Sequence, residues 1–266
     1  MYDPTLDGID KSVRSVRYSE IKPPSGLATF VHCFWELKTV ADLTEDFLYR
    51  ALPDACVNLL LDQVNTNIAG VTALRTKAEV LNLGKSFHYV GMQFYPGVWQ
   101  GNKDEIVDHY VGTPYLGRLP LISINEKITA MDFAHQCLIL ADSVQLLIDE
   151  GLVVGNPVCA IILAQLSEIH SVADMARLAQ LSPRQLQRTL KRVTSFSPHD
   201  LLKVLRLQQS FRSHYLDLYA DQSHYIHSFQ QVTGYTPTKY KEKYRAKCSA
   251  KDRATFPPNQ EPEGDV

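Results

Sequence analysis

Basic and amide side chains recur on one face of segment 182–193. Arg can hydrogen-bond to guanine O6 and N7 with two donors, and Gln can do the same with adenine N6 and N7. Lys and further Arg residues suit phosphate oxygens, which fix the register of a protein on a duplex without reading its sequence. The segment therefore predicts contacts with DNA through Arg184, Gln185, Gln187, Arg188, Lys191 and Arg192.

These side chains need a pair of short helices to position them. Ser171 can cap a first helix, with Asp174 at its third position, and Leu181 fills the turn. Ser182 then caps a second helix, with Pro183 at the first helical position, where a missing N–H costs nothing. Helix, tight turn and helix with a basic outer face is typical of a helix-turn-helix unit. An ordinary helical hairpin with a solvated face is the alternative. The predicted inward residues are Val172, Met175, Ala176, Ala179, Leu186, Leu190 and Val193.

Charge is distributed unevenly along the 266 residues, although the net charge is only −2. Residues 1–170 carry 12 Lys and Arg against 20 Asp and Glu, whereas residues 171–250 carry 13 against 5. A basic part joined to an acidic part favours a nucleic-acid partner for the basic part. A basic, solvated helical domain without such a partner would have the same charge.

The C-terminal part resembles the AraC/XylS family of bacterial transcriptional regulators over about 80 residues. The matching stretches are SPRQLQR at 182–188, FSP at 196–198, LRL at 205–207, YADQSHYIHSF at 219–229 and TGYTP at 233–237. The resemblance implies two helix-turn-helix units joined by a long helix, each placing one recognition helix in the major groove. The implied partners are double-stranded DNA, a second copy of the chain and RNA polymerase.

The resemblance also assigns residues to roles. It implies a first recognition helix at 183–193, with Arg184, Gln187 and Arg188 reading bases, and a linking helix at about 198–215 that begins after Ser197. A second recognition helix at about 221–231 follows the cap Asp221, with Tyr225 and Phe229 in the core. Its outward candidates for DNA binding are Gln222, Ser223 and His227.

Three departures from the family pattern affect the second unit. About a dozen residues that normally form its first helix are missing before Tyr219, Leu218 replaces a Gly, and His227 replaces a common Arg. The sequence therefore predicts a shortened second unit. The alternative function is a protein-interaction or anti-regulator module whose second unit no longer reads DNA. Because a His gains charge as pH falls, His224 and His227 predict a mild pH dependence of DNA affinity.

Residues 13–95 are rich in predicted strands separated by turn signals, which is typical of a β-sandwich or barrel. With the helical remainder this predicts an α+β fold. The stretches RALPDACVNLL at 50–60 and VGMQFYPG at 90–97 resemble the β-rich sensory domain of one AraC-family subgroup, in which Gly is common at the position of Ala55. We therefore expect a sensory or dimerisation domain at 1–120 that responds to a small-molecule effector. The predicted strands cover 29–37, 57–61, 67–71, 79–83 and 88–95.

Apolar periodicity after Pro120 predicts helices at 128–148 and 158–169 within a helical connector at 121–170. These helices either link or dimerise the chain, or they pack on their own sheet. The DNA-binding domain is expected at 171–247. The segment 248–266 has little to bury and is predicted to be a disordered tail.

Aromatic residues in the β-rich part could line an effector pocket, or they could be ordinary core. The candidates are Trp35, Asp54, Phe94 and Tyr95, with Trp99 beside them. We expect no enzyme, because the sequence lacks His-x-His, His-Glu-x-x-His and Gly-x-Ser-x-Gly. No cofactor or metal is expected, because His32 and His88 are better explained as satisfied histidines and Cys56 as a small buried hydrophobe.

Cysteine usage and hydropathy bear on the compartment. Five scattered cysteines without a Cys-x-x-Cys pair argue against a disulfide framework and favour a reducing cytosol. The longest apolar runs are far shorter than the roughly 20 residues of a membrane span. The first ten residues carry three Asp and do not resemble a signal peptide. We therefore expect a cytoplasmic protein that does not bind membranes.

Overall fold

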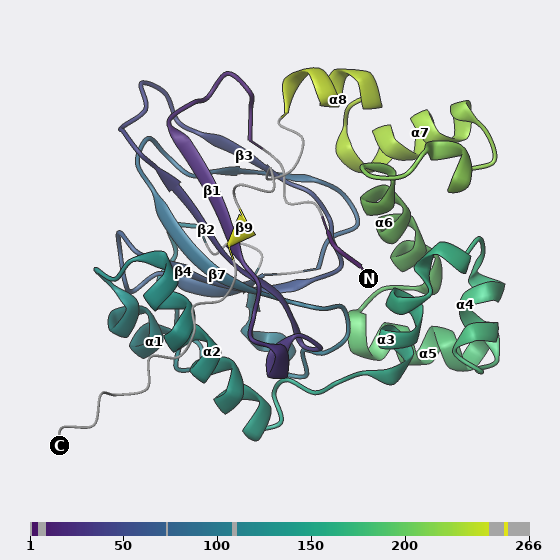
Figure 1. Cartoon of the computed structure of the whole chain (residues 1–266), viewed down its shortest axis with the longest axis horizontal. Coiled ribbons are helices and arrows are strands. Elements are labelled where there is room, and N and C mark those ends of the chain that lie inside the picture. Colours follow the sequence, from purple (N-terminus) through teal and green to yellow (C-terminus); the bar gives the residue numbers. More distant parts are fainter. Residues whose placement is uncertain (1, 5–8, 73, 108–110, 245–252, 255–266) are drawn as a thin grey trace.

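The computed structural model describes residues 2–4, 9–72, 74–107, 111–244 and 253–254. It is a mixed α+β structure, as predicted, with strands in the first part of the chain and helices after Pro120 (Figure 1). The strands are β1 Val16–Ile21, β2 Val31–Thr39, β3 Leu48–Ala51, β4 Val57–Asp62, β5 Ala69–Thr72, β6 Glu79–Asn82, β7 His88–Phe94, β8 Ile106–Val107 and β9 Arg253–Ala254.

Eight α-helices lie between β8 and β9 in the described chain. They are α1 Leu121–Ile128, α2 Phe133–Asp149, α3 Pro157–Ala164, α4 Val172–Leu178, α5 Pro183–Thr194, α6 Pro198–Ser210, α7 Gln222–Thr233 and α8 Pro237–Lys243. Four short 3-10 helices accompany them: η1 Ser25–Leu27, η2 Lys103–Glu105, η3 Leu166–Glu168 and η4 Tyr215–Asp217.

A seven-stranded sheet with the order β8-β5-β4-β7-β2-β1-β9 forms the centre of the β part. Its inner pairings are antiparallel, and only the short edge strands β8 and β9 pair in parallel. Strands β3 and β6 form a separate two-stranded sheet. Side chains of successive strand residues point to opposite faces, so Phe34 and Trp35 in β2 belong to different cores.

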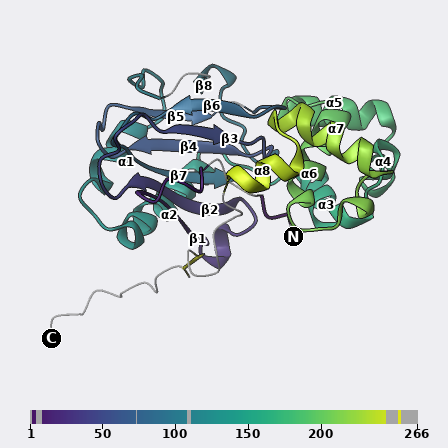
Figure 2. The ribbon, with the colours of Figure 1, turned by 90° about the horizontal axis from the view of Figure 1, so that it is seen from above.

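Two cores cover the two faces of the large sheet. On one face, Phe34, Leu59 and Met92 pack against helices α1 and α2. On the other face, Trp35, Leu60 and Tyr89 belong to a core that includes Leu81 and Tyr49 from the small sheet. The β part is therefore layered as small sheet, large sheet and helices, and Figure 2 shows α1 and α2 against the large sheet.

The predicted helix at 128–148 begins too early. Ile128 is the last residue of α1, which the sequence reading missed, and α2 begins only at Phe133. Ala130 adopts a left-handed φ of 67°, and the Asp132 side chain caps α2 by accepting from the His135 N–H, so the backbone is interrupted between the helices. The predicted helix at 158–169 is likewise α3 followed by η3.

Helix α2 buries its apolar face on the large sheet. Cys137, Leu140 and Val144 are fully buried in the core that contains Phe34 and Met92. Of the two interpretations of this segment, packing on its own sheet therefore describes the contacts of α2. Helix α3 instead joins the core of α4, α5 and α6 through Cys159 and Ile162.

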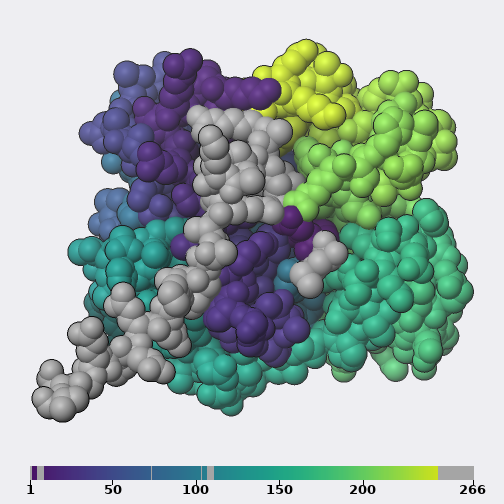
Figure 3. Space-filling model, viewed as in Figure 1, coloured from purple at the N-terminus to yellow at the C-terminus, as the bar shows by residue number. Residues whose placement is uncertain are grey.

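Helices α3 to α8 lie together beside the β part (Figure 2), and the space-filling view shows them packed against it (Figure 3). The predicted disordered tail at 248–266 lies outside the described residues except for Arg253 and Ala254, which pair with Glu20 and Ile21 as β9. In the described part of the chain, no helix has the length and apolar character needed to cross a membrane.

Candidate functional site

Local hydrogen bonds build the helix-turn-helix unit of α4 and α5. The Ser171 side chain accepts from the Asp174 N–H, which confirms the predicted cap of α4. Gln180 takes a left-handed φ of 53° in the turn. Ser182 then accepts from the Gln185 N–H, and Pro183 occupies the first turn, so the predicted cap of α5 is also confirmed.

The outer face of α5 is exposed, polar and strongly basic. Leu186 and Leu190 are buried below it, as the periodicity predicts. The helix contains four cationic residues and no acidic one, and none of the four forms an ion pair with a described residue. All six predicted side chains are exposed and line one open hollow with Ser182: Arg184, Gln185, Gln187, Arg188, Lys191 and Arg192.

Two of these six side chains also stabilise the ends of α5. Gln185 Oε1 accepts from the Ser182 N–H at 2.9 Å and from its hydroxyl at 2.8 Å, completing a capping box. Lys191 Nζ donates to the Ser195 carbonyl at 2.9 Å, at the C-terminal end of the helix. The side chains of Arg184, Gln187 and Arg188 make no such contacts with the described chain.

The segment that precedes α7 contains no α-helix, as the shortened sequence predicts. Only η4 lies between α6 and α7. Aromatic packing fills this region: the Tyr215 ring stacks on Tyr225 with centroids 5.1 Å apart, and Phe211 packs edge-on against Phe229 at 5.6 Å. Tyr225 and Phe229 are buried, as expected.

Helix α7 begins where the sequence predicts, because the Asp221 side chain accepts from the His224 N–H. Its outward candidates Gln222, Ser223 and His227 are all exposed. His227 Nε2 lies 2.7 Å from Gln231 Nε2 on the same helix. Helix α7 contains no Lys, Arg, Asp or Glu, so its outer face lacks the cations of α5.

The end of α7 is attached to the small sheet of the β part. Arg50 of β3 donates from Nη1 to the Thr233 carbonyl at 2.8 Å and from Nε to the Tyr244 hydroxyl at 3.2 Å. Its guanidinium also lies 4.8 Å from the centre of the Tyr235 ring. Just before β6, the Ala78 N–H donates to the Val232 carbonyl at 2.7 Å. The position of α7 therefore depends on β3 and β6.

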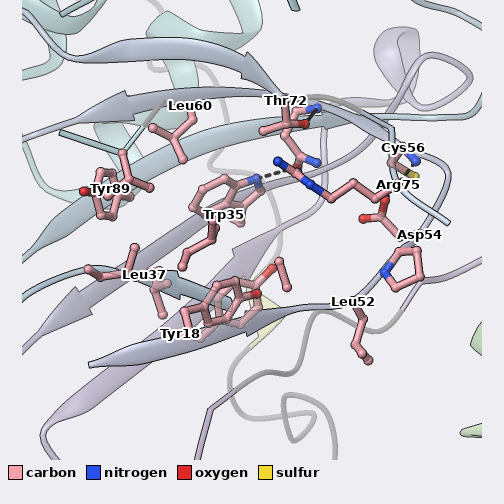
Figure 4. A pocket seen from close by; sticks show the side chains of 17 residues that line it. Tyr18, Trp35, Leu37, Leu52, Asp54, Cys56, Leu60, Thr72, Arg75 and Tyr89 are labelled. Carbon is pink, nitrogen blue, oxygen red and sulfur yellow. Dashed lines mark hydrogen bonds between the residues drawn. The ribbon is translucent and has the colours of Figure 1, made fainter. Parts of the chain in front are cut away.

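A cavity of about 90 Å³ lies between the large and small sheets. Trp35 from β2 lines it, and Arg75 extends toward Trp35 from the end where Asp54 and Cys56 lie (Figure 4). A side chain at Gly91 would collide with the Trp35 ring, so this glycine permits the ring to lie against β7. The other lining residues are Tyr18, Leu37, Tyr49, Ala51, Leu52, Pro53, Asn58, Leu60, Thr72, Leu81, Leu83, Tyr89 and Val111.

The four predicted pocket residues do not all meet in this cavity. Trp35 and Asp54 line it, whereas Phe94 is fully buried on the opposite face of the sheet with Trp99. Tyr95 packs edge-on against His32, with ring centroids 5.7 Å apart. The sequence reading missed Arg75, Asn58 and Thr72, although a polar Asn inside the apolar strand β4 was a usable signal.

The loop 52–56 connects the cavity to both parts of the helical domain. Leu52 lines the cavity and also belongs to the core of α7, with Leu207 and Phe229. Cys56 lines it from the other end and packs in the core of α4 to α6. Between them, Gln208 Nε2 of α6 donates to the Pro53 carbonyl at 2.8 Å.

Asp54 is buried in this loop and begins a chain of polar contacts. It accepts from the Cys56 N–H at 2.9 Å and from Gln93 Nε2 at 2.7 Å. Gln93 Oε1 lies 2.6 Å from His32 Nδ1, His32 Nε2 lies 2.9 Å from Asp3 Oδ1, and Asp3 pairs with Arg212 after α6. Burial raises the pKa of Asp54 to about 7, because desolvation penalises the carboxylate.

Backbone strain accompanies this buried acid. Ala55 has a left-handed φ of 59° and is 1% exposed. Residues other than glycine rarely adopt this conformation, which accounts for the glycine expected here from the resemblance. Strain of this kind persists where surrounding packing holds the backbone in place.

The two strand histidines do not converge. His32 contacts Gln93, Asp3 and Lys22, whereas His88 Nε2 lies 2.9 Å from Glu36 Oε1. Within the described ranges, no three His, Cys, Asp or Glu side chains gather as metal ligands would. Cys56 is buried, and burial raises the pKa of its thiol well above the usual value, which disfavours the reactive thiolate.

The β part of the chain matches a family of known proteins. Residues 19–102 match a family model described as a domain of unknown function (DUF6597). This region contains the end of β1, the strands β2 to β7 and most residues that line the cavity. No curated protein and no solved structure matches the chain.

Proposed function

We propose that this protein is a sequence-specific DNA-binding transcriptional regulator of the AraC type. The observation that carries the proposal is the outer face of α5, where Arg184, Gln187 and Arg188 project from a fully capped helix that follows a tight turn. This is the geometry in which a recognition helix enters a major groove. The resemblance of segment 182–237 to the AraC/XylS family supports the same role.

Electrostatics favours the same partner. Residues 171–250 carry eight more basic than acidic residues, and α5 presents four of the cations without a neighbouring acid on its own helix. Each cation that neutralises a phosphate releases condensed counterions, so affinity should fall steeply with salt. Base-edge contacts by Arg and Gln would then add sequence preference.

The β part supplies the effector response in this proposal. A ligand changes DNA binding only if it favours one arrangement of the recognition helices over another. The loop 52–56 touches the cavity and both helical cores, and Arg50 holds the end of α7. Occupation of the cavity would therefore act on the relative placement of α5 and α7 in a dimer that contacts RNA polymerase.

Selection of tightly bound fragments from a random DNA pool by the full chain tests the proposal. We expect a defined motif, and we expect Arg188→Ala to relax discrimination at one base pair by about 1–3 kcal/mol. Arg17→Ala, an exposed arginine of β1, is the matched control and should leave the motif unchanged. Equal losses on all sequences would make Arg188 a phosphate contact, and sequence-blind binding throughout would contradict the proposal.

A protein-interaction or anti-regulator role is the second candidate. The absence of an α-helix between α6 and α7 in the described chain and the docking of α7 on the small sheet favour it. It predicts no selected motif. It also predicts a protein partner whose capture requires α7 and is lost on substitution of Gln222 and His227.

A further inference from the structure

The cavity between the two sheets has a particular balance of hydrogen-bond donors and acceptors. Its walls are aromatic and aliphatic, with Trp35, Tyr18 and Tyr89 from the large sheet and Tyr49 and Leu81 from the small one. Its polar groups gather at the end where Arg75 and Asp54 lie (Figure 4). A mainly apolar pocket with a few convergent polar groups is typical of a small-molecule site.

The protein itself occupies the acceptors at this end. Trp35 Nε1 donates to Asn58 Oδ1 at 3.0 Å, and the Asn58 N–H donates to Thr72 Oγ1 at 3.0 Å. The two carboxyl oxygens of Asp54 accept from the Cys56 N–H and from Gln93 Nε2. These acceptors therefore already have donors from the protein.

Donors remain at the same place. An indole N–H can only donate, so the oxygen of the Asn58 amide faces Trp35 and its Nδ2 faces away. Among the described residues, neither Asn58 Nδ2 nor the Thr72 hydroxyl proton has an acceptor. Arg75 lines the same end of the cavity, and its guanidinium, which pairs with Glu79, adds a positive charge there.

We propose that this cavity binds a small apolar or aromatic carboxylate, with its acid group held by Arg75, Asn58 and Thr72 and its body against Trp35. A guanidinium and an amide NH₂ match the planar acceptor geometry of a carboxylate. The cavity limits the enclosed body to about one small ring or one branched chain. The ligand's role as effector rests on the proposed function, whereas its binding does not.

Calorimetric titration of the full chain without DNA tests this inference with three matched probes. Phenylacetate carries the acid, phenylacetamide is its neutral analogue, and 2-phenylethylamine carries the opposite charge. We expect phenylacetate to bind and the other two to bind at least about tenfold more weakly, because a charge-assisted pair is lost. Equal binding of the amide, tighter binding of the amine, or no binding of phenylacetate would overturn the inference.

Two variants locate the site. Arg75→Gln removes the charge, and Asn58→Asp keeps the shape and the acceptor for Trp35 but replaces the NH₂ donor by an acceptor. Each should weaken phenylacetate binding about tenfold or more, while Arg17→Gln on the exposed surface of β1 should not. Near-ultraviolet circular dichroism checks that the aromatic cavity remains packed in each variant. Unchanged affinity in a packed Asn58→Asp protein would contradict the assignment.

The DNA selection described above keeps the two ideas separate. Phenylacetate binding without any selected DNA motif would refute the proposed regulator and leave the carboxylate site in place. A defined DNA motif together with no phenylacetate binding would refute the carboxylate site and support the proposed regulator.

Discussion

Helices α5 and α7, the two proposed recognition helices, differ in charge and in the contacts that hold them. Helix α5 carries four cations, follows a complete partner helix and ends in its own capping contacts. Helix α7 carries no Lys, Arg, Asp or Glu, is separated from α6 only by the short helix η4, and is held at its C-terminal end by Arg50 and the Ala78 N–H from the β part. In the proposed regulator, α5 therefore supplies most of the affinity for DNA, and the β part controls where α7 lies.

The largest expected effect separates the two helices directly. Arg188→Ala with Arg192→Ala should weaken DNA binding at least about 100-fold and lower the salt slope by about 2, since two phosphate or base contacts are lost. Gln222→Ala with His227→Ala should cost less than about tenfold. Fluorescence anisotropy against salt measures both. Equal losses from the two pairs would remove the contrast between the helices.

A smaller effect is expected from releasing α7. Arg50→Met removes the donors to Thr233 and Tyr244 but keeps an aliphatic stem, and it should lower the free energy of unfolding by about 1–3 kcal/mol. Lys38→Met on β2 is the control, because Lys38 pairs with Glu36 inside the β part and makes no ion pair or side-chain hydrogen bond with the described residues of α7 or α8. Hydrogen exchange should increase in α7 and α8 but not in α5. Exchange that rises equally in α5 would mean that both units depend on the same attachment.

Asp54, in the loop 52–56, should make the stability of the fold depend on pH. Its folded pKa of about 7 lies above the ordinary value of 3.8, so the folded chain holds this proton more tightly than the unfolded chain. The resulting stability is complete below about pH 4 and is lost as pH rises toward 7, with a slope of up to about 1.4 kcal/mol per pH unit.

Urea unfolding at several pH values measures this slope, and Asp54→Asn should flatten it. The slope is the readout because an asparagine cannot accept the hydrogen bonds of both Cys56 and Gln93, which alters stability at every pH. An Asp54→Asn protein with the same slope as the parent would show that another group titrates.

Local chemistry could be predicted better than long-range packing. The starts of three helices could be predicted from their caps Ser171, Ser182 and Asp221, because a cap depends on only a few neighbouring residues. The break at Ala130 was missed because apolar periodicity continues through it. Alternation along β7 indicates that Met92 and Phe94 share a face, but not which layer covers that face, so the sequence left open whether Phe94 lines a pocket or belongs to the core, where the structure places it. Arg75 reaches the cavity from a loop, and no local pattern predicts that.

Most hydrogen bonds between the β part and the helices end on backbone carbonyls. The carbonyl acceptors are those of Val232, Thr233, Lys241 and Lys243 on the helical side and that of Pro53 on the other. Every residue has a backbone carbonyl, so the accepting residue of each of these hydrogen bonds can be substituted without loss of the acceptor. Related helical modules could therefore be exchanged onto this β part by recombination without redesigning the joint. Chimeric proteins that combine this β part with a different helical module become accessible in this way.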